Sequence, residues 1–108
     1  MSASDLIVEL KDSNAFDEVV IKSTLPVCVD FYADWCGPCK ALAPQLKMLV
    51  EQKKNFKLVK VNVDECPEIA DNYEISGLPT IKFFKNGVVI GEVIGNNIKG
   101  VIEIVEKL

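Results

Sequence analysis

The stretch Asp34-Trp35-Cys36-Gly37-Pro38-Cys39-Lys40 places two cysteines three positions apart, between an apolar strand-like run and an apolar helix-like run. Side chains at positions i and i+3 are neighbours only on a helix, where their Cβ atoms are about 5–6 Å apart. A disulfide needs Cβ atoms about 3.5–4.5 Å apart, so a slightly tightened first helical turn lets these thiols bond. So small a ring constrains the unfolded chain weakly. The spacing therefore indicates a redox-active disulfide, which forms and breaks repeatedly, and not a structural one.

The position of the two thiols predicts different roles for them. The first turn of a helix has unpaired N–H groups and a partial positive charge, and both stabilise a thiolate. We therefore expect Cys36 to be the low-pKa nucleophile and Cys39, more buried and one turn further, to be the resolving thiol. Pro38 presets a helical φ and needs no N–H there. Trp35 covers one side of the sulfur atoms, and Gly37 lets a partner's backbone come close.

Composition limits the class of protein. The chain has 108 residues, 49% of them hydrophobic and 26% charged, with a formal net charge of −4. This length predicts one domain, residues 1–108, and the acidic balance argues against a general nucleic-acid binder. No apolar run approaches the roughly 18 residues of a membrane span, and the first residues resemble neither a basic leader nor a signal core. We expect a cytoplasmic monomer that binds neither nucleic acid nor membranes.

The four cysteines and the absence of histidine restrict the chemistry further. Cys28 and Cys66 do not form a second close pair, so the spacing matches no zinc or iron–sulfur pattern and we expect no metal site. Without histidine, Cys–His hydrolases and Ser–His–Asp triads are excluded. Cys28 is interpreted as a small core residue. Cys66 is interpreted as an incidental, more exposed surface thiol, with regulatory oxidation as the alternative.

The chain as a whole alternates between strand-like and helix-like segments. Residues 26–32 are apolar at nearly every position, which is typical of a central strand covered on both faces. Asn86-Gly87 predicts a hairpin between strands 81–85 and 88–94. The other predicted segments are strands 6–10 and 56–63, and helices over 12–22, after the cysteine motif, over 68–73 and over 98–108. The order β-α-β-α-β-α-β-β-α predicts an α/β fold, a mixed central sheet with helices on both faces.

Asp30 is the unusual residue of the central strand. A carboxylate there must be paired, protonated or exposed at the strand end, because burial disfavours its charged form. We interpret Asp30 as a buried proton acceptor for the Cys39 thiol, and the alternative is an edge residue that points to solvent. Lys60 in the strand 56–63 is a candidate charge partner for Asp30, and the alternative is a lysine on the solvent face.

Taken together, these motifs closely resemble those of the thioredoxin family, and they span nearly the whole chain in the expected order. The matching positions are Asp30, residues 31–40, Pro44, residues 77–80, residues 84–87 and Gly95. The resemblance implies the thioredoxin fold, a redox disulfide between Cys36 and Cys39 tuned by Gly37 and Pro38, and burial of Asp30 beneath Cys39 near Lys60.

The resemblance also implies a docking surface. It implies a cis bond between Leu78 and Pro79, with the Leu78 backbone facing the cysteines and available to an extended substrate segment. A shallow apolar surface would be formed by Trp35, Gly77, Leu78, Pro79 and Gly95. Two positions depart from the family pattern. Tyr32 stands where tryptophan is frequent, which affects packing, and Asn96-Asn97 follows Gly95 at the docking rim, where a small residue is more usual.

The implied function is that of a protein-disulfide reductase. A separate flavoprotein, thioredoxin reductase, would reduce the Cys36-Cys39 disulfide with NADPH, and the chain itself would bind no cofactor. The family's partners include peroxiredoxins, methionine sulfoxide reductases and ribonucleotide reductase. Two alternatives stay open. An oxidase or isomerase of the protein-disulfide-isomerase kind usually has histidine where Pro38 stands, and a binding module would hold a partner around Trp35 and Pro79 in either redox state.

Overall fold

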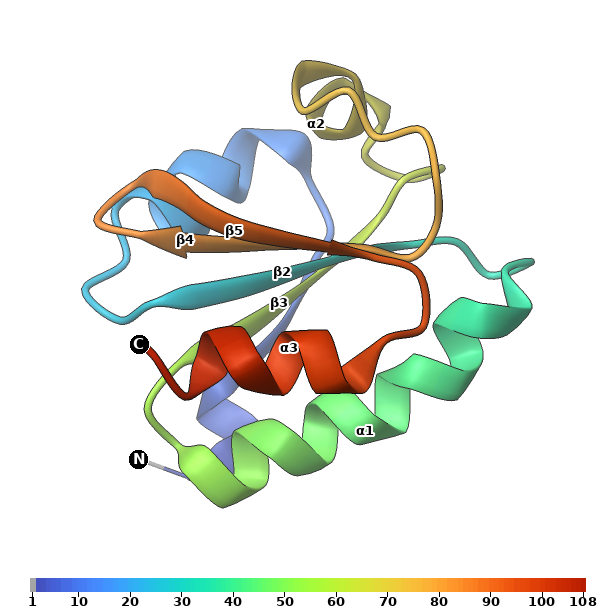
Figure 1. The fold of residues 1–108 in the computed structure, drawn as a ribbon. Helices are drawn as coiled ribbons and strands as arrows, with labels where there is room; N and C mark the ends of the chain where they lie inside the picture. Colours follow the sequence, from blue (N-terminus) through green and yellow to red (C-terminus); the bar gives the residue numbers. More distant parts are fainter. Residues whose placement is uncertain (1) are drawn as a thin grey trace.

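The computed structural model describes residues 2–108, which form a five-stranded sheet in the order β1-β3-β2-β4-β5 (Figure 1). The strands are β1 (Ile7–Leu10), β2 (Val27–Tyr32), β3 (Lys57–Asn62), β4 (Thr80–Lys85) and β5 (Val88–Ile94). β1, β3 and β2 are parallel, whereas β4 and β5 are antiparallel to their neighbours. The predicted mixed sheet is confirmed, with β2 at its centre.

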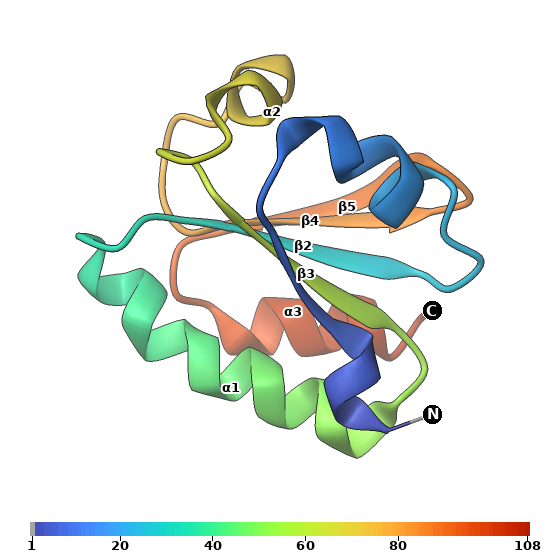
Figure 2. The same cartoon turned by 180° about the vertical axis from the view of Figure 1, so that it is seen from behind.

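Helices cover both faces of this sheet (Figures 1 and 2). α1 (Gly37–Lys53) and α3 (Ile98–Val105) lie on one face, and α2 (Pro67–Asn72) lies on the other with the short helical segment 13–21. Cys28 packs in the core under α1 and α3. Val29 and Phe31, on the same strand, pack in the core on the opposite face of the sheet. β2 is apolar on nearly every position because both of its faces are covered.

The segment 12–22 is helical as predicted, but its geometry is irregular. A 3₁₀ turn, Ser13–Ala15, precedes a π-helical turn, Asp17–Ile21, and the Asp12 carboxylate accepts a hydrogen bond from the Asn14 N–H at 2.9 Å. So short a helix is held by tertiary packing more than by its own hydrogen bonds. Burial of Phe16 and Val20 therefore decides its shape. At the amino end, β1 starts one residue later than predicted, because Ala3–Leu6 forms another 3₁₀ turn.

The two unpaired cysteines are both buried. Cys28 is a core residue as predicted, but the prediction of an exposed thiol at Cys66 is wrong. Cys66 immediately precedes α2, and its thiol points inward, where Sγ lies 3.8 Å from the Leu10 carbonyl oxygen. A turn residue has no periodicity that indicates its direction, so the sequence could not predict this burial.

The turns of the carboxyl-terminal half are those predicted. Asn86 and Gly87 have φ values of 53° and 79°, the left-handed conformation that a tight hairpin between β4 and β5 requires. Asn97 caps α3, since its side chain accepts a hydrogen bond from the Gly100 N–H at 3.0 Å. α3 ends at Val105, earlier than predicted. Within residues 2–108, no helix has both the length and the apolar character to cross a membrane.

Candidate active site

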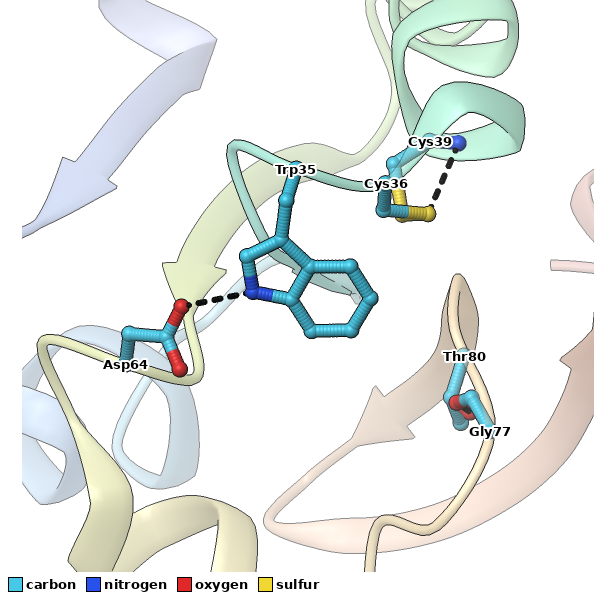
Figure 3. The surroundings of a disulfide bond; sticks show 6 residues. All are labelled: Trp35, Cys36, Cys39, Asp64, Gly77 and Thr80. Atoms are coloured by element: carbon cyan, nitrogen blue, oxygen red, sulfur yellow. Dashed lines mark hydrogen bonds between the residues drawn. A yellow bond between two sulfur atoms is a disulfide. The ribbon is translucent and has the colours of Figure 1, made fainter.

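The cysteine pair lies where the chain passes from β2 into α1 (Figure 3). Cys36 is the N-cap of α1, Cys39 lies in the first turn, and the two form a disulfide with Cα atoms 5.3 Å apart. The Cys39 N–H donates a hydrogen bond to Cys36 Sγ at 3.1 Å. This amide is one of those that a helix start leaves without a backbone partner, and the same contact stabilises a thiolate at Cys36.

The two sulfur-bearing residues differ in hydrogen bonding more than in burial. Cys36 is 5% exposed and Cys39 is 4% exposed, so the expected deeper burial of Cys39 is not seen in this disulfide form. Only the Cys36 sulfur accepts the amide hydrogen bond. Pro38 occupies the first turn of α1, where its missing N–H leaves no broken hydrogen bond, and Pro44 lies inside the same helix.

The loop before β4 faces the sulfur atoms (Figure 3). Its Leu78–Pro79 peptide bond is cis, as the family resemblance implies. The Thr80 hydroxyl donates a hydrogen bond to the Gly77 carbonyl oxygen at 2.6 Å. On the other side, the Gly95 N–H donates to the Pro79 carbonyl oxygen at 2.8 Å, and Gly95 has a φ of 90° that favours glycine. The loop is therefore fixed from both sides.

An apolar groove of about 630 Å³ runs beside the disulfide. Its lining residues are Trp35, Cys36, Gly37, Pro38, Val63, Ile75, Ser76 and Leu78. Trp35 is 71% exposed, and its Nε1–H donates a hydrogen bond to the Asp64 carboxylate at 3.0 Å, which orients the ring (Figure 3). Three of the predicted docking residues do not line the groove: Gly77, Pro79 and Gly95. Their backbone groups instead take part in the hydrogen bonds that fix the loop containing Leu78.

Sequence reasoning missed part of this groove. Val63, Ile75, Ser76 and the Trp35 partner Asp64 come from loops that follow β3 or precede the cis bond. Their only signal was proximity in sequence to predicted site residues or strand ends. A larger groove, about 840 Å³, lies between the segment 11–17 and α2, but neither of the paired cysteines lines it.

Asp30 is buried, with 2% of its surface exposed, so the alternative of an edge residue in solvent is wrong. With Cys39 and Lys60 it lines a cavity of about 110 Å³ on the α1 side of the sheet. Its Oδ1 is, within residues 2–108, the one buried side-chain oxygen or nitrogen that has no hydrogen-bond partner. Burial raises the pKa of Asp30 to about 6, although Lys60 acts to lower it.

Lys60 lies beside Asp30 in the register of β3 and β2. It is half-buried, and the ion pairs in the described part of the chain do not include it. Its Nζ instead lies 4.8 Å from the centre of the Tyr32 ring, within the range of a cation–π contact. Lys60 therefore acts on Asp30 through space and not through a direct ion pair.

Residues 7–107 match the family model described as thioredoxin. The chain belongs to the thioredoxin family. It is 39% identical over 102 residues to a thioredoxin of Echinococcus granulosus, covering 94% of each chain. Thioredoxin-1 of Saccharomyces cerevisiae is also 39% identical, over 85% of this chain and 88% of the yeast protein. Thioredoxins are protein-disulfide oxidoreductases, so this chain is a thiol–disulfide oxidoreductase, and Cys36 and Cys39 form its Cys-x-x-Cys pair.

Solved thioredoxin structures have the same fold. The crystal structure of oxidised mitochondrial thioredoxin 3 from Saccharomyces cerevisiae has a TM-score of 0.88 at 34% identity and covers 99% of this chain and 100% of the yeast chain. Schistosoma mansoni thioredoxin has a TM-score of 0.89 at 38% identity, covering 100% and 99%. The relatives also include a chloroplastic thioredoxin of Spinacia oleracea and a mitochondrial thioredoxin of Mus musculus, so the family spans several compartments.

Proposed function

We propose that this member of the thioredoxin family reduces disulfides in partner proteins, with Cys36 as nucleophile and Cys39 as resolving thiol. The Cys36 thiolate attacks one partner sulfur, forms a mixed disulfide and releases the other partner sulfur as a thiolate. Cys39 then loses its proton and attacks Cys36 Sγ, which releases the second partner thiolate and forms the Cys36-Cys39 disulfide. Two electrons pass to the partner. The hydrogen bond from the Cys39 N–H to Cys36 Sγ is the observation that carries this assignment.

Asp30 is the proposed acceptor of the Cys39 proton. The two residues line the same cavity of about 110 Å³, a volume that admits about three water molecules to carry the proton between them. A pKa of about 6 leaves Asp30 ionised at neutral pH, yet more basic than an ordinary carboxylate. Three further residues are proposed to tune the redox reactivity of the cysteine pair. Lys60 acts through its charge, and Gly37 and Pro38 act through the shape of the first helical turn.

The groove beside the disulfide is the proposed docking surface. Trp35, Val63, Ile75 and Leu78 supply apolar contact next to Cys36. An extended partner segment can lie there and pair with the Leu78 backbone, while Gly77, Pro79 and Gly95 keep that loop in place. The chemistry that fits is a disulfide flanked by apolar residues on an accessible stretch of chain.

A separate flavoprotein, thioredoxin reductase, is the proposed source of electrons, with NADPH as its reductant and no cofactor bound by this chain. The proposed partners are peroxiredoxins, methionine sulfoxide reductases and ribonucleotide reductase. Support for the first comes from a similar solved structure, 34% identical, that concerns thiol resolution in yeast mitochondrial 1-Cys peroxiredoxin via the glutathione and thioredoxin systems. Such a reductase needs a reducing compartment, and we propose that the protein acts there as a cytoplasmic monomer.

Insulin reduction by purified variants tests the proposed roles. Cys36→Ser and Cys39→Ser should each abolish turnover, and Cys39→Ser should retain partners as mixed disulfides that reductant releases. Cys28→Ala, which removes a thiol from the core under α1 and α3, should keep the activity of the folded protein. Full activity in either active-site variant would show that the assignment is wrong.

A further inference from the structure

Three charged side chains form a row across the parallel half of the sheet. In the strand register Glu9 of β1 lies beside Lys60 of β3, and Lys60 lies beside Asp30 of β2. Residues paired in this way project from the same face of a sheet. This is the face covered by α1, because Asp30 and Lys60 share a cavity with Cys39 and Ala43 of that helix. An acidic residue therefore lies on each side of Lys60 in the sheet.

Tyr32 spans this row. It lies two residues after Asp30 on the same face of β2, and its hydroxyl reaches past β3 to the Glu9 carboxylate, 2.8 Å from both oxygens. On the way its ring passes Lys60, whose Nζ lies 4.8 Å from the ring centre. The Glu9 carboxylate thus contacts the hydroxyl of Tyr32, whereas the Lys60 ammonium group lies by the ring of the same residue.

The ion pairs found among residues 2–108 leave Lys60 without a carboxylate in direct contact. Its charge is therefore not neutralised by Glu9, although the two residues are register neighbours. The titratable and charged groups around Asp30 come from four elements and one loop. They are Lys60 of β3, Glu9 of β1, Cys28 and Tyr32 of β2, Cys39 and Lys40 of α1, and Asp34 of the loop between β2 and α1.

We propose that Glu9 and Tyr32 are positioning residues for proton transfer at Asp30: the Tyr32 hydroxyl holds the Glu9 carboxylate off Lys60, so the ammonium charge stays directed at Asp30. This inference rests on the proposed role of Asp30 as proton acceptor. It gives the first strand, which contributes nothing to the cysteine pair or the docking groove, a part in the chemistry.

The arrangement gives the two residues opposite effects. The Glu9 charge itself acts to raise the pKa of Asp30, so loss of that charge lowers it. Loss of the Tyr32 hydroxyl leaves the charge in place but frees the carboxylate to pair with Lys60. An ammonium group neutralised by Glu9 stabilises the Asp30 carboxylate less, and the pKa of Asp30 then rises.

The test is a ¹³C NMR titration of the Asp30 carboxyl carbon in the oxidised protein, where neither active-site thiol titrates. Glu9→Gln should lower the titration midpoint of Asp30, and Tyr32→Phe should raise it. Each shift should be about half a pH unit, as expected for charges two strands (about 10 Å) apart near a protein surface. In the double variant the released carboxylate no longer exists. The Asp30 midpoint of the double variant should therefore equal that of the Glu9→Gln variant alone.

Two matched controls separate this effect from packing and from net charge. Tyr73→Phe removes a half-buried hydroxyl on the opposite face of the sheet, and Glu106→Gln removes one exposed negative charge after α3. Both should leave the Asp30 midpoint unchanged. Urea unfolding of every variant, under the same conditions, identifies any change that follows from lost stability.

The outcomes divide clearly. An Asp30 midpoint that is unchanged in both single variants overturns the inference. So does a Tyr32→Phe shift that persists in the Glu9→Gln background, since the hydroxyl would then act without Glu9. The pH dependence of insulin reduction is measured in parallel. If the midpoint moves as expected while the rate profile does not, the positioning of Asp30 stands and its role as proton acceptor fails.

Discussion

Asp30 combines burial with a carboxylate oxygen that has no hydrogen-bond partner, next to one half of the redox pair. Desolvation of such a group opposes its ionisation, and it is the main cause of its raised pKa. A carboxyl group with a raised pKa binds its proton more tightly in the folded state than in the unfolded state. Asp30 therefore contributes to stability at low pH, and this contribution is lost as Asp30 ionises.

Asp30→Asn tests this linkage. The pKa of Asp30 is raised from 3.8 to about 6, so its contribution is complete below pH 4 and is lost as pH rises through 6. Between pH 4 and 7 the free energy of unfolding of the natural protein should fall, relative to the variant, by roughly 2 kcal/mol. Urea unfolding of both oxidised proteins measures this difference. Parallel pH dependences of the two free energies of unfolding would contradict the predicted linkage.

Cys28 and Cys66 should resist alkylation in the folded protein. Both are buried, and burial raises the pKa of each thiol, so little thiolate is present and little reaches solvent. Oxidised protein treated with iodoacetamide should show no added mass in urea-free buffer and two added groups after unfolding. Reduced protein is the control, since Cys36 should be labelled first. Rapid labelling of Cys66 in folded, oxidised protein would restore the earlier interpretation of a surface thiol.

Single residues differ in how far the sequence alone predicts them. Asp30 was identified because a charge in an otherwise apolar central strand is unusual. The contact between Tyr32 and Glu9 could not be predicted, because β3 lies between their strands and enters the chain only later. Such a contact depends on strand order, which no local pattern specifies.

At the scale of elements, α3 depends on its N-cap. The Asn97 side chain accepts the Gly100 N–H, whereas Asn96 beside it is exposed and has no comparable role. Asn97→Ala should lower the free energy of unfolding by about 1 kcal/mol, and Asn96→Ala should change it little. Urea unfolding of the two variants gives the comparison. Equal losses would mean that the cap hydrogen bond does not stabilise α3.

The strands were the most predictable elements. β2 follows from its continuous apolar run, and β4 and β5 follow from the Asn86-Gly87 turn between them. The segment 12–22 was predicted as a helix but not as a 3₁₀ turn followed by a π-helical one. Backbone geometry in so short a segment follows from the side chains it must bury, Phe16 and Val20, and not from its own sequence pattern.

At the scale of the whole molecule, we expect the fold to persist without its disulfide. The cores on the two faces of the sheet consist of buried residues other than those of the small cluster that contains Cys36 and Cys39. A ring closed by so short a loop stabilises the chain by no more than about 2 kcal/mol in the entropy model. Reduction should thus leave the far-ultraviolet circular dichroism spectrum unchanged. The midpoint of urea unfolding should shift only moderately on reduction. Loss of the helix and strand signal on reduction would contradict this prediction.

Both ends of the chain lie at the side of the molecule away from the start of α1 (Figures 1 and 2). A linker or a fused cargo attached at either terminus therefore leaves the molecule on the side remote from its sulfur atoms. The domain can therefore be attached to another protein, or to a solid support, while its dithiol stays accessible to large partner proteins.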